Sequence, residues 1–283
     1  MINKVLFGDC RDTLSQIIES GTKVRMCVTS PPYYGLRDYG GEGDQIGLET
    51  SPEKFVEELV KVFRLVRECL TDDGTLWLNI GDSYYNYRSG KGQALPRQSC
   101  ASNDQDLPQF NPRRGLKLEG LKDKDLIGIP WMLAFALRSD GWYLRQDIIW
   151  HKPNPMPESV RDRCTKSHEY IFLLSKSPKY FFNVDAIKQP TVDGKQLKRK
   201  HSVWTIKTKP YKEAHFAVYP TDLVSPCILA GSEPDDIILD PFFGSGTTGQ
   251  VALELGRNYL GCELHSDYDQ IIQKRLASDS SFA

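Results

Sequence analysis

The sequence has few features of a metal, disulfide or membrane protein. Its seven cysteines include no Cys-x-x-Cys pair, and none lies at zinc-ligand spacing from a histidine pair, so we expect no metal and reduced thiols. It has no apolar N-terminal signal and no long apolar run, which predicts no membrane span and a cytoplasmic location. The formal net charge is −1, so any indication of nucleic-acid binding must come from local patches.

Apolar runs of strand length alternate with helical patterns along the chain. Its 283 residues are enough for one large α/β domain with insertions or for two small domains. Expected strands cover 5–7, 25–28, 75–80, 146–150, 170–174, 237–239 and 259–262. The clearest helix begins at Ser51-Pro52 and should end before 72–74, and further helices are expected at 130–139, 222–229, 248–255 and 267–277. The alternation predicts an α/β fold, a mostly parallel seven-stranded sheet with helices on both faces.

The segment Thr29-Ser30-Pro31-Pro32-Tyr33 directly follows the apolar run 24–28. Consecutive prolines restrict φ and remove two backbone donors, so the carbonyls at the strand end are held rigidly outward. The Ser30 hydroxyl adds an acceptor, and Tyr33 offers a face for stacking a heterocycle. The segment therefore predicts a pocket for the exocyclic amino group of a nucleobase, although a simple turn after a buried strand would use the same residues.

A glycine loop, 240–248, follows the expected strand 237–239 and precedes a helix. Glycines at such a position let the backbone approach a ligand closely, and Glu263, about 20 residues later, is placed to bind ribose hydroxyls. Gly244, Gly246 and Gly249 also satisfy the dinucleotide spacing. Asp240, however, would repel a pyrophosphate and favour a sulfonium or an α-amino group, which indicates S-adenosylmethionine over NAD.

Both loops follow strands, so both are expected at the carboxyl edge of the sheet, where ligands of open α/β sheets bind. The two segments are far apart in the sequence and can still face each other there. We therefore predict that the folded chain places the proline turn beside the glycine loop.

The order Thr-Ser-Pro-Pro-Tyr, then Asp-Pro-Phe-x-Gly-x-Gly-Thr-Thr, resembles the amino-group DNA methyltransferases of the restriction-modification type, in the permuted β arrangement. Segments 8–10, 150–155 and 215–220 extend the likeness over most of the chain. The resemblance implies a single Rossmann-like class I methyltransferase domain over 1–283 with loop insertions for DNA recognition. It implies S-adenosylmethionine as cofactor, double-stranded DNA as substrate, and a bacterial, archaeal or phage origin.

The resemblance also assigns residues to roles. Ser30, Pro31, Pro32 and Tyr33 would hold the flipped base, Asp9 the adenine amino group of the cofactor, and Glu263 its ribose. Further cofactor contacts would come from Cys10, Thr29, Asp240, Pro241, Phe242, Gly244, Ser245, Gly246, Thr247 and Thr248. Many adenine-modifying relatives carry Asp or Asn where this chain has Ser30, which favours cytosine N4 over adenine N6. A methyltransferase for RNA or protein glutamine, or a non-catalytic cofactor-binding protein, are the remaining alternatives.

The amino nitrogen of a base is a poor nucleophile because its lone pair is delocalised into the ring. Acceptors at the Ser30 hydroxyl and the Pro31 carbonyl can draw its hydrogens and align it with the methyl group, without a covalent intermediate. The base must leave the duplex to reach them. Cys227 suggests the nucleophile of ring-carbon methylation, but its apolar surroundings favour a packed core thiol.

Two segments are candidate DNA contacts. The segment 186–213 is basic, with Trp204 and Tyr211 interleaved, and favours phosphate contact over a solvated loop. The predicted DNA-binding residues are Lys152, Lys198, Arg199, Lys200 and Lys207. The segment 86–125 is a predicted flexible insertion, equally compatible with a surface loop and a DNA clamp, and 34–47 is a predicted flap over the base. A cognate restriction endonuclease and a homodimer are left open.

Overall fold

The computed structural model describes residues 1–35, 45–85, 118, 120–191, 193–209 and 219–277. Eight of the strands they form make one sheet in the order β1-β10-β9-β2-β3-β5-β4-β8. These strands are β1 (Lys4–Phe7), β2 (Val24–Thr29), β3 (Leu70–Ile80), β4 (Tyr143–His151), β5 (His168–Ser175), β8 (Val203–Thr205), β9 (Ile237–Asp240) and β10 (Asn258–Glu263). All seven predicted strands are confirmed, and β8 is an eighth.

The sheet is mostly parallel. The five strands from β1 to β3 pair in parallel, as do β4 and β8, and β5 alone runs antiparallel to its neighbours β3 and β4. The carboxyl ends of β1, β10, β9, β2 and β3 therefore meet at one edge. The loops after these strands are the ones that carry the predicted site.

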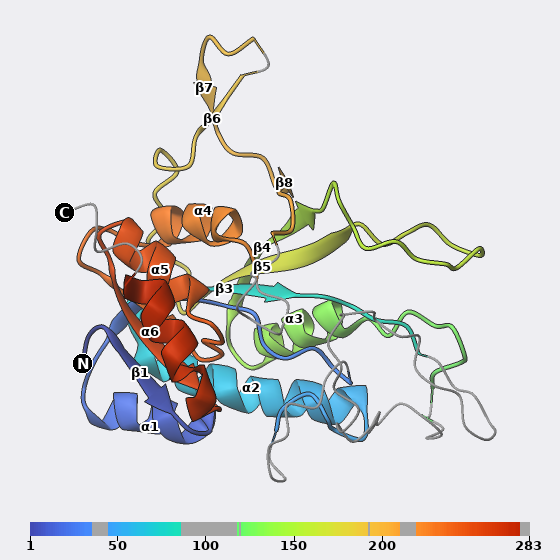
Figure 1. Cartoon of the computed structure of the whole chain (residues 1–283), viewed down its shortest axis with the longest axis horizontal. Coiled ribbons are helices and arrows are strands. Elements are labelled where there is room, and N and C mark those ends of the chain that lie inside the picture. The colour runs from blue at the N-terminus through green and yellow to red at the C-terminus, as the bar shows by residue number, and fades with distance from the viewer. Residues whose placement is uncertain (36–44, 86–117, 119, 192, 210–218, 278–283) are drawn as a thin grey trace.

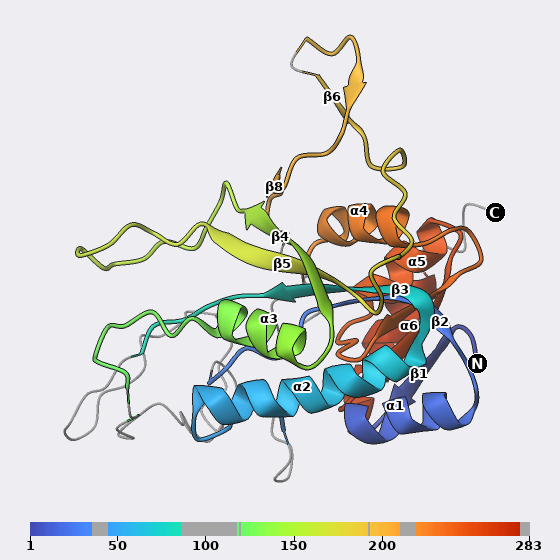
Figure 2. The same ribbon diagram turned by 180° about the vertical axis from the view of Figure 1, so that it is seen from behind.

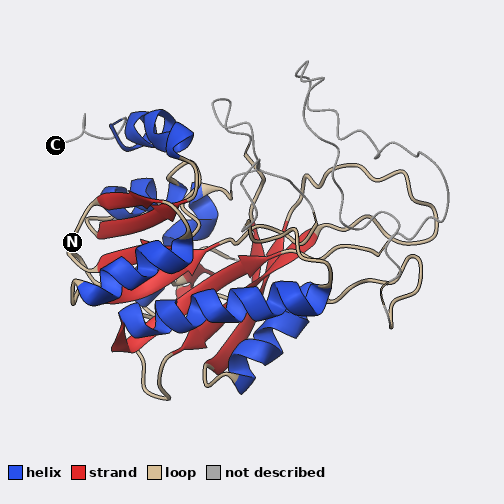
Figure 3. Ribbon diagram, turned by 90° about the horizontal axis from the view of Figure 1, so that it is seen from below, coloured by secondary structure: helices blue, strands red, loops and turns tan. Residues whose placement is uncertain are grey.

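Helices cover both faces of the sheet, as predicted (Figures 1 and 2). One layer contains α1 (Cys10–Glu19), α2 (Pro52–Cys69) and α3 (Ile129–Ser139), and Figure 3 shows it from below, crossing the strands. The other contains α4 (Thr221–Gly231), α5 (Thr247–Glu254) and α6 (Asp269–Ala277), which follows the short 3-10 helix η1 (Ser266–Tyr268). Among the described α-helices, only α1 lacked a predicted counterpart.

Helix α2 begins as the sequence predicts but ends differently. The Ser51 hydroxyl accepts a hydrogen bond from the Lys54 amide at 3.3 Å, and Pro52 occupies the first turn. The helix ends at Cys69 because Leu70 takes an extended backbone, with φ −68° and ψ 147°. The acidic residues expected to end the helix therefore lie inside β3.

The basic segment 186–213 is partly core. Its first part forms an arm with β6 (Gln189–Pro190) and β7 (Leu197–Lys198), which projects beyond α4 in Figure 1. Its second part enters the sheet as β8, where Trp204 is 4% exposed and lies 6.4 Å from Trp77 between ring centroids. Lys200 lies over the Trp204 ring, and burial lowers the pKa of its ammonium group. Trp204 is thus a core residue with no free face for a base.

Several predicted features lie outside the described residues. They include most of the insertion 86–125, much of the flap 34–47, and Tyr211 with the start of the 215–220 segment. The described end of the insertion packs back on the domain, where the Leu118 amide donates to the Tyr85 hydroxyl at 3.1 Å. Across the parts of the chain that the structure describes, no helix has the length and apolarity to cross a membrane.

Candidate active site

The proline turn and the glycine loop lie side by side, as predicted. Their strands β2 and β9 are neighbours, with Met26 opposite Ile238 and Cys27 opposite Leu239. At the ends of these strands the Thr29 hydroxyl donates to Oδ1 of Asp240 at 2.6 Å. One hydrogen bond thus joins two motifs that are 211 positions apart.

Asp240 is a buried hub under the glycine loop. With 1% of its surface exposed, the carboxylate also accepts from the hydroxyls of Thr248 at 2.5 Å and Tyr219 at 2.9 Å, and from the Phe242 amide at 3.0 Å. Burial raises the pKa of Asp240, and these hydrogen bonds oppose the rise. The structure places Asp240 where it holds the loops in position and offers little surface to a ligand. Tyr219 was not identified from the sequence, because its partners are distant in the chain.

The glycine loop is rigidly supported from behind. Phe243 packs so closely under the sheet that a Cβ on Gly261 would lie 2.4 Å from its ring. At the loop itself, Gly246 has φ +86°, which favours glycine. Arg275 of α6 donates to the Ser245 hydroxyl at 2.5 Å. Phe243 belongs to the predicted loop 240–248, and its ring is buried. Arg275 was not among the predicted site residues, because it lies 30 positions from Ser245 in the sequence.

Glu263 ends β10, next to the end of β1, where Phe7 is its parallel partner. It is 8% exposed, and its two carboxylate oxygens accept from the amides of Gly244 at 2.8 Å and His265 at 3.0 Å. Burial raises the pKa of Glu263 to about 7, even though these amides favour the ionised form. The Gly244 amide of the glycine loop therefore helps to position Glu263, the predicted ribose ligand.

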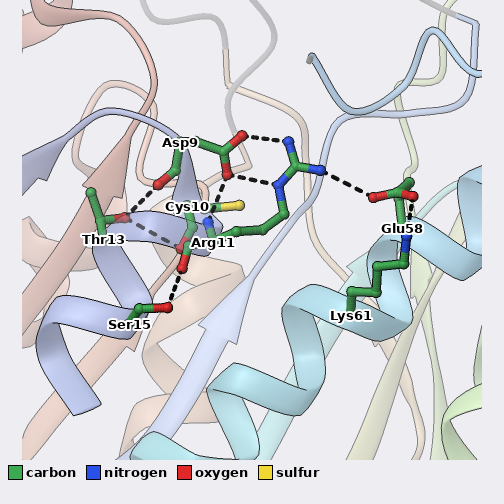
Figure 4. Close-up of polar contacts among 7 residues, drawn as sticks. All are labelled: Asp9, Cys10, Arg11, Thr13, Ser15, Glu58 and Lys61. Carbon is green, nitrogen blue, oxygen red and sulfur yellow. Dashed lines mark hydrogen bonds and ion pairs between the residues drawn. The ribbon is translucent and has the colours of Figure 1, made fainter. Parts of the chain in front are cut away.

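Asp9 caps α1 and pairs with Arg11 (Figure 4). Its Oδ1 accepts from the Arg11 amide at 2.7 Å, the guanidinium bonds both carboxylate oxygens, and Arg11 is held in turn by Glu58 at 3.0 Å. Burial would raise the pKa of Asp9, but the bonds from Arg11 outweigh it and lower the pKa. Oδ2 accepts one hydrogen bond among the described residues, so it retains acceptor capacity for an amino group.

Two buried polar atoms beside these groups have no partner in the described part of the chain: the Thr247 hydroxyl and Nε2 of His265. Helix α5 starts at Thr247 without a side-chain cap, so the helix end also presents polar groups. A buried polar atom without a partner is costly unless a ligand or water satisfies it. A cofactor with hydroxyl, amino and carboxylate groups, such as S-adenosylmethionine, fits this set.

The proline turn carries the predicted base pocket. Ser30 is half-buried and Pro31 is buried, while Pro32 and Tyr33 are half-buried. The Tyr33 ring lies against Gly81, where an added Cβ would be 2.7 Å from the ring, and its hydroxyl donates to Glu169 of β5 at 2.8 Å. Glu169 was not among the predicted site residues, because nothing local in the sequence links it to Tyr33.

The predicted DNA-binding lysines and arginine occupy different environments. Lys152 forms an ion pair with Glu169, lies over the Trp150 ring and is 17% exposed, so it does not lie free for a phosphate. Arg199 and Lys207 are exposed, whereas Lys198 and Lys200 are half-buried. Cys227 is 1% exposed in the core, as expected of a packed thiol, and burial raises its pKa.

A mostly parallel sheet whose carboxyl edge combines a glycine loop, a buried acid and a proline turn is the arrangement of a Rossmann-like fold. The sequence also matches the model of the N6/N4 DNA methylase family over residues 24–274. The chain belongs to this family of DNA methylases, and S-adenosylmethionine is its cofactor.

Curated relatives support the same family. Type II methyltransferase M.SmaI of Serratia marcescens is 50% identical over 275 residues, which is 96% of this chain and 90% of that protein. Type II methyltransferase M.Cfr9I of Citrobacter freundii is 48% identical over 279 residues, 97% of this chain and 87% of that protein. The PvuII DNA methyltransferase, described as cytosine-N4-specific, shares the fold with a TM-score of 0.69 at 16% identity, covering 100% of this chain and 89% of that one.

Proposed function

We propose that this DNA methylase transfers the methyl group to N4 of a cytosine that is flipped out of a specific duplex sequence. The observation that carries the proposal is the hydrogen bond from Thr29 to Asp240, which places the proline turn against the cofactor loop. The choice of cytosine rests on Ser30, a neutral hydroxyl where many adenine-modifying relatives carry Asp or Asn.

The proline turn holds and orients the amino group. The Ser30 hydroxyl and the Pro31 carbonyl accept its two hydrogens, which localises the nitrogen lone pair and directs it at the methyl carbon. Tyr33 stacks on the base and offsets part of the cost of unstacking, a few kcal/mol. Bound S-adenosylmethionine supplies the electrophilic methyl group: the N–C bond forms as the S–C bond breaks, and an amino proton leaves to solvent.

The cofactor-facing residues divide by position. Glu263 accepts from the ribose hydroxyls, and Asp9 accepts from the adenine amino group through Oδ2. The loop would hold the methionine end, and the cofactor would also be lined by Cys10, Thr29, Pro241, Phe242, Gly244, Ser245, Gly246, Thr247 and Thr248. Asp240 acts through this loop, because its own oxygens are bonded inside the protein.

DNA recognition belongs to the arm and to the insertion. Within the single domain 1–283, Lys198, Arg199, Lys200 and Lys207 of the segment 186–213 contact phosphates, and the insertion 86–125 is a second candidate DNA contact. Arg199 and Lys207 are exposed, which supports this role. The relatives' description as Type II methyltransferases supports a cognate endonuclease for the same site. Self-association is tested by sedimentation at micromolar concentration.

The test identifies the product. The protein is incubated with isotope-labelled S-adenosylmethionine and mixed-sequence duplex DNA, and the modified nucleoside is identified by mass. N4-methylcytosine is the expected product, and N6-methyladenine would overturn the assignment from Ser30. Labelling of RNA or protein glutamine in preference to DNA would overturn the choice of substrate. Ser30→Ala should lower turnover with little change in cofactor affinity.

A further inference from the structure

A polar network lies behind the Tyr33 ring. Its other members come from β3, from β5 and from the position directly after β4, which carry neither the proline turn nor the glycine loop. Glu169 at the start of β5 accepts from the Tyr33 hydroxyl at 2.8 Å through Oε2. Its other oxygen, Oε1, pairs with the ammonium of Lys152, which follows β4. Asn79 of β3 completes the group, with its amide nitrogen 3.1 Å from the Tyr170 carbonyl and 3.4 Å from Oε2 of Glu169.

The network is shielded and internally balanced in charge. The side chains of Glu169 and Lys152 are 15% and 17% exposed, and Asn79 is 5% exposed as a residue. Lys152 is further stabilised by the Trp150 ring, whose centroid lies 4.1 Å from its nitrogen. Because Lys152 neutralises Glu169, the carboxylate can remain a strong acceptor for the phenol in a place that excludes much of the solvent.

The contacts restrain Tyr33 at both ends. Its ring edge lies against Gly81, where even a methyl group would be only 2.7 Å away, and its hydroxyl is bonded to Glu169. A ring restrained in this way cannot swing about χ1 without losing a charge-assisted hydrogen bond. The face that stacks the base therefore keeps one orientation relative to Ser30.

We propose that Glu169, held by Lys152, is a positioning residue that fixes the orientation of Tyr33 for methyl transfer. The inference rests on the proposed stacking of the target base on Tyr33. Glu169 touches neither base nor cofactor, and its effect passes through the phenol hydroxyl. Lys152, which the sequence suggested as a phosphate contact, has its role in this pair.

The test is a double-mutant cycle on single-turnover methylation at saturating DNA and cofactor. Tyr33→Phe keeps the stacking ring and removes the hydroxyl, and Glu169→Gln keeps an acceptor oxygen but removes the charge. Each should slow methyl transfer about tenfold, the size of one charge-assisted hydrogen bond. The double variant should be no slower than the slower single variant, because both substitutions remove the same contact.

Two further measurements separate positioning from stability. The dissociation constant of S-adenosylhomocysteine should stay within about twofold of wild type in all variants, since the network lies on β3, β4 and β5, away from the glycine loop. Asp236→Asn is the matched control. It breaks a half-buried ion pair between Asp236, which precedes β9, and Arg25, at 3.0 Å. This substitution should leave the methylation rate unchanged.

Rates of the two single variants equal to wild type, or effects that multiply in the double variant, would overturn the role of Glu169. With either of these results, methylation of DNA by the wild-type protein in the same assay would still support the proposed function. Wild-type protein that methylates no DNA would instead overturn the proposed function. If the charge change at Glu169 prevents folding, the methylation rate of Tyr33→Phe alone decides, with Tyr33→Ala as the inactive reference.

Discussion

Replacing Glu263 by glutamine should stabilise the protein while it weakens cofactor binding. Burial raises the pKa of Glu263 from its ordinary 4.5 to about 7. The carboxylate is 8% exposed, so this difference translates into a cost of about 3 kcal/mol for keeping it ionised in the folded state. Under the proposed function Glu263 is the acceptor for the ribose hydroxyls, so this cost in stability is a consequence of keeping that acceptor buried.

The sign follows from proton binding. The folded protein binds the Glu263 proton more tightly than the unfolded chain, so the cost is absent below pH 4.5. Stability is then lost progressively as the pH rises toward 7, and the full cost applies above that value. Glutamine has no such titration. It can replace only one of the two acceptor oxygens that bond Gly244 and His265, and losing the other bond costs about 1 kcal/mol.

The difference between the two effects sets the expected magnitude. At pH 8 Glu263→Gln should raise the free energy of unfolding of the cofactor-free protein by about 2 kcal/mol. At pH 5 the two effects should cancel to within about 1 kcal/mol. Urea denaturation followed by tryptophan fluorescence at pH 5, 6, 7 and 8 measures this trend. Glu57→Gln on the exposed side of α2 is the control.

Calorimetric titration with S-adenosylhomocysteine completes the experiment. The variant should bind at least about tenfold more weakly at pH 8, because an ionised acceptor for the ribose is lost. A stability difference that is the same at every pH would refute the reasoning about burial. Unchanged affinity beside the expected pH trend would refute the assignment of Glu263 to the ribose.

Three other substitutions test the support of the site. Gly261→Ala should lower stability by about 1–3 kcal/mol in urea denaturation, because its Cβ would lie 2.4 Å from the Phe243 ring, and a neutral effect would contradict that packing. Arg275→Ala frees the Ser245 hydroxyl and should weaken S-adenosylhomocysteine binding about tenfold by calorimetry, whereas equal affinity would show that the loop needs no such support. Trp204→Ala should cost about 3–5 kcal/mol of stability, since the ring is 4% exposed. A loss of DNA affinity with unchanged stability would instead show that Trp204 contacts DNA.

Much of the fold could be predicted because its signals are local. The buried strands β2, β9 and β10 are short apolar runs next to turn residues, and α2 combines a serine cap, a proline and an apolar face. The alternation of strands and helices also implied a parallel sheet with ligand loops at one edge. The pairing of β2 with β9 and the bond from Thr29 to Asp240 confirm that inference.

Errors and omissions occurred where a residue's environment depends on distant chain segments. Trp204 lies among lysines in the sequence, yet β8 pairs with β4 and buries it. Lys152 carries a charge that suits DNA, yet Glu169 pairs with it inside the domain. Composition describes the neighbours along the chain, whereas burial and pairing are set by neighbours in space.

By itself the sequence determined the motifs, their order and the fold class, because turn chemistry and apolar periodicity act over a few residues. Only the tertiary structure decided how the acids are used. It turns Asp240 inward onto Thr29, Thr248 and Tyr219, and it leaves Glu263 buried at the cofactor edge with a raised pKa. The physical reason is that hydrogen-bond partners and desolvation come from segments that meet only when the sheet assembles.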